Sequence, residues 1–141
     1  MGVPNTIFGR NKTCILDQER MLWRMLCDTP SGLKKHVSGD CVMLFPSGQA
    51  LTNGADSSPT IDEALDGYEP WSTYRFDAEP RFVEIGMMAA SVAYTVTLAR
   101  LAGDADAGRG RMEETSAAAV SVWRQGADGE WELCMHHLAE L

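Results

Sequence analysis

The C-terminal stretch, residues 117–141, limits the possible folds more than any other part of the chain. It reads AAAVSVWRQGADGEWELCMHHLAEL, with β-branched and aromatic residues on both sides of Asp128-Gly129. Such residues favour strands, and Asp-Gly between two of them is typical of a hairpin turn. The stretch therefore predicts two paired β-strands. The first carries Trp123, and the second carries Trp131 and ends in two histidines.

An amphipathic helix is predicted upstream, over residues 13–28. Thr13 is in position to cap it, and Pro30 excludes helical geometry just before itself. At about 100° per residue the apolar side chains of this segment share one arc. The arc consists of Ile15, Leu16, Leu22, Trp23, Leu26 and Cys27. Glu19 projects into its middle. A helix with such a face needs a sheet to pack against, and the C-terminal hairpin supplies part of one.

The segments between these two regions add short helices and further strands. Helices are predicted over residues 32–37 and from Thr60, where Thr60-Ile61-Asp62-Glu63 is a capping box and Gly67 ends the helix. Strands are predicted over residues 40–45, 71–76, 82–85, 88–101, 113–124 and 131–138, with loops at 47–59 and 103–110 and a break at 77–80. Helices followed by long antiparallel strands indicate one α+β domain, residues 13–141, behind a flexible N-terminal arm, residues 1–12.

The charge of the chain argues against one class of partner. Its formal net charge of −8 repels phosphate backbones, so nucleic acid is not expected as a partner. No apolar run approaches the roughly 20 residues that span a membrane, and no signal peptide is visible. The four cysteines form no C-x-x-C pair. We expect them to be reduced and mostly buried, in a cytoplasmic protein.

Motifs for covalent, cofactor or metal chemistry are missing from the sequence. It contains no G-x-S-x-G, no P-loop and no dinucleotide fingerprint, so neither a nucleophile nor a cofactor is expected. His136 and His137 are neighbours on a predicted strand and should point to opposite faces. They are therefore poorly placed to bind one metal ion together, and no metal site is predicted.

Three stretches together resemble a known family. Glu19 and Trp23 stand at the spacing E-x-x-x-W in a helix that ends at Asp28, and Ala93-Tyr94 lies within AASVAYTVT. The hairpin VWRQGADGEWELCMHHL is similar to the pattern VW…DG-x-W-x-h-x-H-x-H, where h is apolar. These features resemble the nuclear-transport-factor-two-like superfamily, and within it the SnoaL-like group related to the association domain of calcium/calmodulin-dependent protein kinase. The resemblance implies a cone-shaped, curved antiparallel sheet with N-terminal helices packed on its concave face.

The resemblance also implies a pocket inside the cone. Eight side chains are expected to line it and to bind ligand: Trp23, Phe45, Trp71, Tyr94, Val96, Ser121, Trp123 and Leu138. The family's terminal H-x-H corresponds to Met135 and His137 here. The arginines of the kinase pocket align with Val96, Ser121 and Leu138, and the catalytic Asp of the steroid isomerases aligns near Phe45. A mainly apolar pocket that binds a small apolar molecule is therefore the favoured interpretation.

Members of the family often pair through the outer face of the sheet, so a homodimer is expected. Apolar contacts are predicted from one of the two faces formed by Ala117, Ala119, Val120 and Val122. The expected pocket and the expected dimer together indicate a binding or association module that catalyses no reaction.

Glu19 is open to two interpretations. A buried carboxylate needs hydrogen-bond partners, and the available ones are Tyr94, His137 and the indole of Trp123 or Trp131. In the favoured interpretation Glu19 is a structural group that joins the helix to the sheet. In the alternative, Glu19 and His137 are the acid–base pair of a SnoaL-like isomerase, cyclase or dehydratase, and Tyr94 is a hydrogen-bond donor. The substrate would then be a hydrophobic carbonyl compound.

Overall fold

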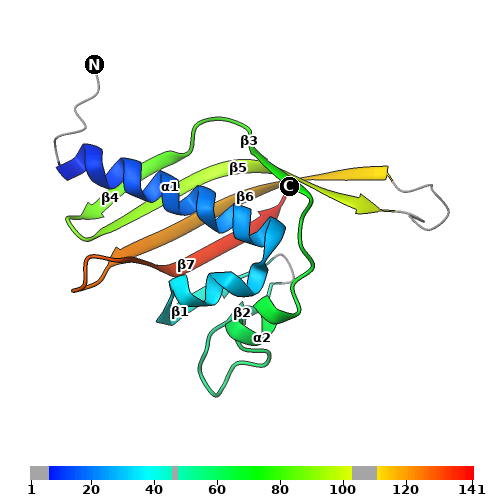
Figure 1. Ribbon diagram of the computed structural model, residues 1–141, viewed down its shortest axis with the longest axis horizontal. Coiled ribbons are helices and arrows are strands. Elements are labelled where there is room, and N and C mark those ends of the chain that lie inside the picture. Colours follow the sequence, from blue (N-terminus) through cyan, green and yellow to red (C-terminus); the bar gives the residue numbers. More distant parts are fainter. Residues whose placement is uncertain (1–6, 46–47, 103–110) are drawn as a thin grey trace.

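One long helix lies across a seven-stranded sheet in the computed structural model, which describes residues 7–45, 48–102 and 111–141. The helix is α1 (Ile7–Asp28), and Figure 1 shows it spanning the strands on one face. The 3-10 helix η1 (Pro30–His36) and the short α2 (Ile61–Asp66) lie near β1 (Val37–Leu44) and β2 (Ala50–Leu51) (Figure 1). The predicted α+β class is confirmed.

The strands are ordered β2-β1-β7-β6-β5-β3, and β4 pairs with β5 along the same edge as β3. Their bounds are β3 (Thr73–Phe76), β4 (Arg81–Gly86), β5 (Ala89–Ala102), β6 (Arg111–Gln125) and β7 (Trp131–Glu140). All neighbours are antiparallel except β1 and β7, which are parallel. The expectation of a wholly antiparallel sheet is therefore wrong for this pair. The connection from β1 to β7 includes all the other strands, so no tight turn forces these two strands to run antiparallel.

The long hairpin of β5 and β6 is the centre of the sheet. Its register runs without interruption from Ala89 opposite Arg124 to Ala102 opposite Arg111. On the β5 edge, residues 77–80 separate β3 from β4, as the sequence predicts. There the Asp77 N–H donates to the Thr95 carbonyl at 3.1 Å. The β6–β7 turn also forms where predicted, with Gly129 at a φ of 83° that favours glycine.

The first helix begins earlier than predicted. It starts at Ile7 rather than Thr13, and the Thr13 hydroxyl donates to the Gly9 carbonyl at 3.1 Å instead of capping an end. Contacts with the sheet stabilise the added turns: the Phe8 ring meets the Phe82 ring edge-on at 5.3 Å. Part of the predicted flexible arm is thus helical, and residues 1–6 lie outside the described residues.

The helix α2 forms as its sequence predicts. The Thr60 hydroxyl accepts from the Glu63 N–H, the Glu63 carboxylate accepts from the Thr60 N–H, and Gly67 follows the last turn. Other boundaries differ. The predicted helix at 32–37 is the 3-10 helix η1, β1 starts before residue 40, and β2 interrupts the predicted loop 47–59. The predicted loop 103–110 lies outside the described residues.

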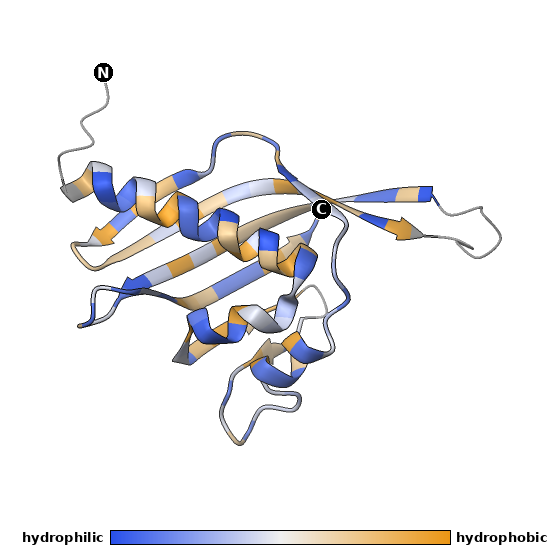
Figure 2. Ribbon diagram, viewed as in Figure 1, coloured by the Kyte–Doolittle hydropathy of each residue, from blue (hydrophilic) through white to orange (hydrophobic). Residues whose placement is uncertain are grey.

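The core lies between the apolar face of α1 and the inner face of the sheet. Figure 2 shows apolar and polar residues alternating along α1, and Trp23, Trp123 and Leu133 have no solvent exposure. No helix of the described segments is both long and apolar enough to cross a membrane. Of the four free cysteines only Cys41 is buried, and Cys14 is exposed, so the expectation of mostly buried thiols is wrong.

Candidate functional site

Glu19 is completely buried at the interface between α1 and the sheet, with an exposed fraction of 0%. It lies on the same helix face as Ile15, Leu22 and Trp23 because residues spaced by three or four share a face. Opposite it, Ser121 on β6 is small and leaves room for the carboxylate. The prediction that Glu19 points into the core is confirmed.

Three donors satisfy the carboxylate. The Tyr94 hydroxyl donates to Oε2, the Ser121 hydroxyl donates to the same oxygen at 2.7 Å, and the Trp123 indole N–H donates to Oε1 at 2.8 Å. The Trp23 indole N–H in turn donates to the Tyr94 hydroxyl at 2.7 Å. Hydrogen bonds to a charged group contribute roughly 1.5–3 kcal/mol each, which offsets much of the cost of burying the carboxylate. The network joins α1 to β5 and β6.

His136 extends this network toward β7. Its Nδ1 lies 2.8 Å from the Ser121 hydroxyl oxygen, and the two residues are paired in register. Burial lowers the pKa of His136 to about 4, so the ring is neutral at pH 7. Since the Ser121 proton goes to Glu19, Nδ1–H donates to Ser121 and fixes the tautomer of His136.

The same burial shifts the two other acids of the network. It raises the pKa of Glu19, while the hydrogen bonds from Tyr94, Ser121 and Trp123 act in the opposite direction. Burial and the neighbouring Glu19 raise the pKa of Tyr94 well above its usual range. These perturbed groups resemble an acid–base centre, but solvent does not reach Glu19, and His136 is only 3% exposed. The network is therefore closed to solvent in this structure.

His137 does not belong to this network, contrary to the alternative interpretation. It is exposed, while His136 is buried. The reason is a β-bulge: Val122 pairs with Met135 but Trp123 pairs with Leu133, which leaves Cys134 as an extra residue. A bulge reverses the alternation along a strand. Leu133 before it and His136 after it consequently both face inward, and the structure does not bring His137 together with Glu19.

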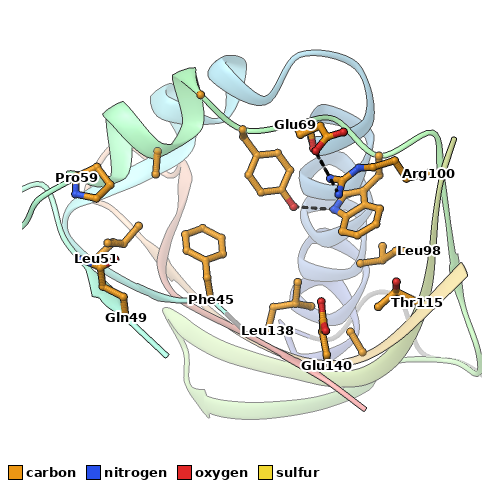
Figure 3. Close-up of a pocket in the computed structure, with 15 residues that line it drawn as sticks. Phe45, Gln49, Leu51, Pro59, Glu69, Leu98, Arg100, Thr115, Leu138 and Glu140 are labelled. Atoms are coloured by element: carbon orange, nitrogen blue, oxygen red, sulfur yellow. Dashed lines mark hydrogen bonds and ion pairs between the residues drawn. The ribbon is translucent and has the colours of Figure 1, made fainter. Parts of the chain in front are cut away.

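An apolar pocket of about 440 Å³ lies beside this core, beneath α2 and the segment that follows it (Figure 3). Its apolar wall consists of Phe45, Leu51, Pro59, Ala64, Leu98, Ala117, Leu138, Tyr68 and Trp71. Gln49, Glu69, Arg100, Thr115 and Glu140 add polar groups. Leu51, Leu98, Ala117 and Leu138 are buried, whereas Gln49, Glu69 and Glu140 are exposed, so the pocket has an apolar floor and an open polar rim.

A polar cluster holds one wall of the pocket in place. The Arg100 guanidinium lies 3.8 Å from the centre of the Trp71 ring, and its Nη2 donates to the Glu69 carbonyl at 2.6 Å. The Trp71 indole N–H donates to the Tyr68 hydroxyl at 2.7 Å. Burial raises the pKa of Tyr68, with a smaller opposing effect from Trp71. Contacts within the protein itself thus hold this wall in place.

The structure brings together only some of the predicted ligand-binding residues. Phe45, Trp71 and Leu138 line the pocket. The remaining five belong to the packed core around Glu19: Trp23, Tyr94, Val96, Ser121 and Trp123. Tyr94 also touches a shallow depression on the outer side of β5 and β6.

Arg100 and Glu140 were not predicted from the sequence as pocket residues. Each stands two positions after a pocket residue on its strand, Leu98 or Leu138, and side chains two apart share a face. Tyr68 and Glu69 follow α2 and had no comparable signal. Within residues 7–45, 48–102 and 111–141, no three His, Cys, Asp or Glu side chains form a group that could hold a metal ion.

Comparison with known proteins identifies the fold. The sequence matches no family model and no curated protein. A nuclear transport factor 2 (NTF2-like) superfamily protein from Salmonella enterica is 18% identical with a TM-score of 0.71, over 92% of this chain and 89% of that one. The association domain of CaMKII from C. elegans is also 18% identical, with a TM-score of 0.71 over 92% and 95%.

A candidate ketosteroid isomerase from Parabacteroides distasonis is 12% identical, with a TM-score of 0.68 over 90% of this chain and 85% of that one. Likeness at such low identity establishes the fold and no activity. The chain has the nuclear-transport-factor-two-like fold that the sequence resemblance implies.

Proposed function

We propose that this nuclear-transport-factor-two-like domain is a binding module that holds a small, mostly apolar molecule in the pocket beneath α2. The observation that carries the proposal is the pocket itself. Its volume of about 440 Å³ lies within the roughly 300–1,000 Å³ usual for small-molecule sites, and apolar and aromatic side chains form most of its lining. The ordered cluster of Tyr68, Trp71 and Arg100 reduces the entropy lost on binding.

Binding is favoured over acid–base catalysis because the chemical groups and the pocket are separate. Glu19 and His136 do not line the pocket, and both already bond to Ser121 in the core. A substrate would have to open the packing of Trp23 and Trp123 to reach them. His137, the predicted second member of the pair, faces away. The similarity to a candidate isomerase concerns the fold alone.

The binding module is also proposed to act as a homodimer. The outer face of the sheet carries a row that crosses five strands in register and is apolar except at Ser91: Val83, Ser91, Val122, Met135 and Val42. Val83 is 56% exposed and Met135 39% exposed. Of the positions predicted to make contact, Val120 and Val122 lie on this outer face, whereas Ala117 and Ala119 are buried on the inner one.

The binding proposal is tested by mass spectrometry of the native protein, purified without added ligand, and by titration with an apolar fluorescent probe. We expect a co-purified apolar molecule, or saturable probe binding at one site per chain. Ala64→Leu, which adds bulk inside the pocket, should weaken probe binding at least five-fold. Ala55→Leu adds the same bulk at an exposed loop position and should not. Equal affinities in the two variants would place the probe elsewhere and overturn the proposal.

A further inference from the structure

The pocket contains three charged side chains, and two of them neutralise each other. The Arg100 Nη1 lies 3.7 Å from the Glu69 Oε2, and Nη2 donates to the Glu69 backbone carbonyl. The Arg100 Nε donates to the Pro70 carbonyl at 3.4 Å, and the guanidinium plane covers the Trp71 ring. Arg100 therefore uses its charge and two of its N–H donors to hold the pocket wall.

Glu140 is the third charged group, and it has no such partner. In the described part of the chain no ion pair or side-chain hydrogen bond involves it. Its register opposite Ala117 places it on the inner face of β7. Figure 3 shows Glu140 beside Leu138, across the pocket from Glu69 and Arg100. The lining as a whole thus carries one uncompensated negative charge next to an apolar surface.

We infer that the pocket selects an amphipathic cation: a small amine whose apolar body rests on Leu138 and Phe45 and whose ammonium group pairs with Glu140. This inference rests on the proposed binding function. The aromatic rings of Phe45 and Tyr68 extend the apolar surface that the body of the amine would contact. The formal net charge of −8 on the whole chain also attracts cations to the pocket mouth.

An anionic ligand fits the same pocket less well. To reach the Arg100 guanidinium, a carboxylate would have to displace the Glu69 carboxylate and approach Glu140, whose charge repels it. A neutral ligand would gain the apolar contacts but leave Glu140 unpaired. The charge of the ligand is therefore the property that separates the three cases.

The test uses three probes that share a naphthalene body and differ in charge: 2-(1-naphthyl)ethylamine, 2-(1-naphthyl)ethanol and the anion of 1-naphthaleneacetic acid. Their dissociation constants are measured by calorimetry at pH 7 and low salt. An ion pair at an accessible site favours the amine over the alcohol by up to about five-fold, and the carboxylate should bind most weakly. Added salt should reduce the preference for the amine, because it screens the exposed carboxylate.

Glu140→Gln should remove the preference for the amine, so that the amine and the alcohol bind with equal affinity. Glu132→Gln is the matched control, because it removes the same charge from β7 at a position paired with Arg124, away from the pocket lining. It should keep the preference for the amine. Circular dichroism of both variants checks that they retain the fold.

The results separate this inference from the proposed function. If all three probes bind equally, or if the carboxylate binds most tightly, the inference is overturned while the pocket remains a binding site. If none of the probes binds, including the neutral alcohol, the proposed binding function fails and the inference with it. An amine preference that survives Glu140→Gln would also overturn the inference.

Discussion

At the scale of single residues, His136 links stability to pH most directly. Burial lowers its pKa from 6.5 to about 4. Between pH 6.5 and about pH 4, the unfolded chain binds a proton at His136 that the folded protein does not bind. Its contribution to stability is therefore complete above pH 6.5 and is lost as the pH falls toward 4, by up to about 3 kcal/mol. His136 thus opposes folding in acid. Its neighbour His137 is exposed and differs from it in burial.

We predict that His136→Gln removes much of this acid destabilisation. Urea unfolding at several pH values between 4 and 7 measures the effect. The difference in free energy of unfolding between the wild type and the variant should shift in favour of the variant as the pH falls. His137→Gln is the control, since it changes the adjacent but exposed ring, and its pH profile should follow the wild type. Parallel profiles for His136→Gln and the wild type would show that His136 is not buried as described.

Glu19 has the opposite linkage to pH. Because burial raises its pKa above 4.5, the folded protein binds this proton more readily than the unfolded chain. The resulting stability is present below pH 4.5 and is lost as the pH rises through the folded pKa. Comparing wild type with Glu19→Gln isolates this effect from that of His136, which remains in both proteins.

We predict that Glu19→Gln costs about 1–2 kcal/mol at pH 7, because the amide still accepts from Trp123 and the two hydroxyl groups can reorient. Glu19→Leu should cost more, about 3–5 kcal/mol, since it leaves the donors of Tyr94, Ser121 and Trp123 without an acceptor. Urea unfolding monitored by circular dichroism measures both. Equal losses in the two variants would mean that the hydrogen bonds contribute little and that Glu19 mainly fills space.

At the scale of elements, α2 depends on its cap because it is short. It has six residues, and an isolated helix of that length is unstable in water. Its capping box satisfies two N–H groups at once, through Thr60 and Glu63. Since Ala64 of this helix lines the pocket, the cap also supports the proposed binding site.

We predict that Thr60→Ala lowers the free energy of unfolding by about 1 kcal/mol, the usual cost of losing an N-cap. Probe affinity at the pocket should fall with it. Thr13→Ala is the matched control: its hydroxyl bonds within α1 rather than capping it, so we expect less than about 0.5 kcal/mol. If the control costs as much as Thr60→Ala, the capping interpretation of Thr60 loses its support.

The elements themselves were largely predictable, and the reason lies in periodicity. The arc of α1, the capping box at Thr60 and the alternation along β5 are local patterns that determine their own secondary structure. The inward position of Glu19 followed from the same arc. The start of α1 at Ile7 did not, because contacts such as Phe8 with Phe82 come from residues far apart in the chain.

The bulge at Cys134 was equally invisible in the sequence. A bulge is a property of two paired strands, and no residue type in WELCMHHL indicates that Cys134 has no register partner on β6. That one extra residue decides whether His136 or His137 enters the core. The pocket shares this limitation: Tyr68 and Glu69 reach it through the path of the chain after α2, whereas Arg100 and Glu140 follow simple alternation.

At the scale of the whole molecule, the two faces of the sheet have different roles. The inner face is covered by α1 and carries the buried network. No helix in the described part of the chain covers the outer face. A second row beside the first brings Ala93, Val120 and Leu44 into register with Arg81 and His137. Exposed apolar patches of this kind typically mark protein–protein contacts. Stable interfaces bury roughly 1,200–2,000 Å² in total, which requires several strands of such a face.

We predict that the wild type sediments as a dimer and that Val122→Lys converts it to a monomer. The lysine would place a charge at the centre of the apolar row, where a second copy would have to desolvate it. Sedimentation velocity over a concentration series measures the change. Met112→Lys is the control, because Met112 is also exposed and apolar but lies near the far end of the β5–β6 hairpin. A wild type that stays monomeric, or a Val122→Lys variant that stays dimeric, would exclude this face as the interface.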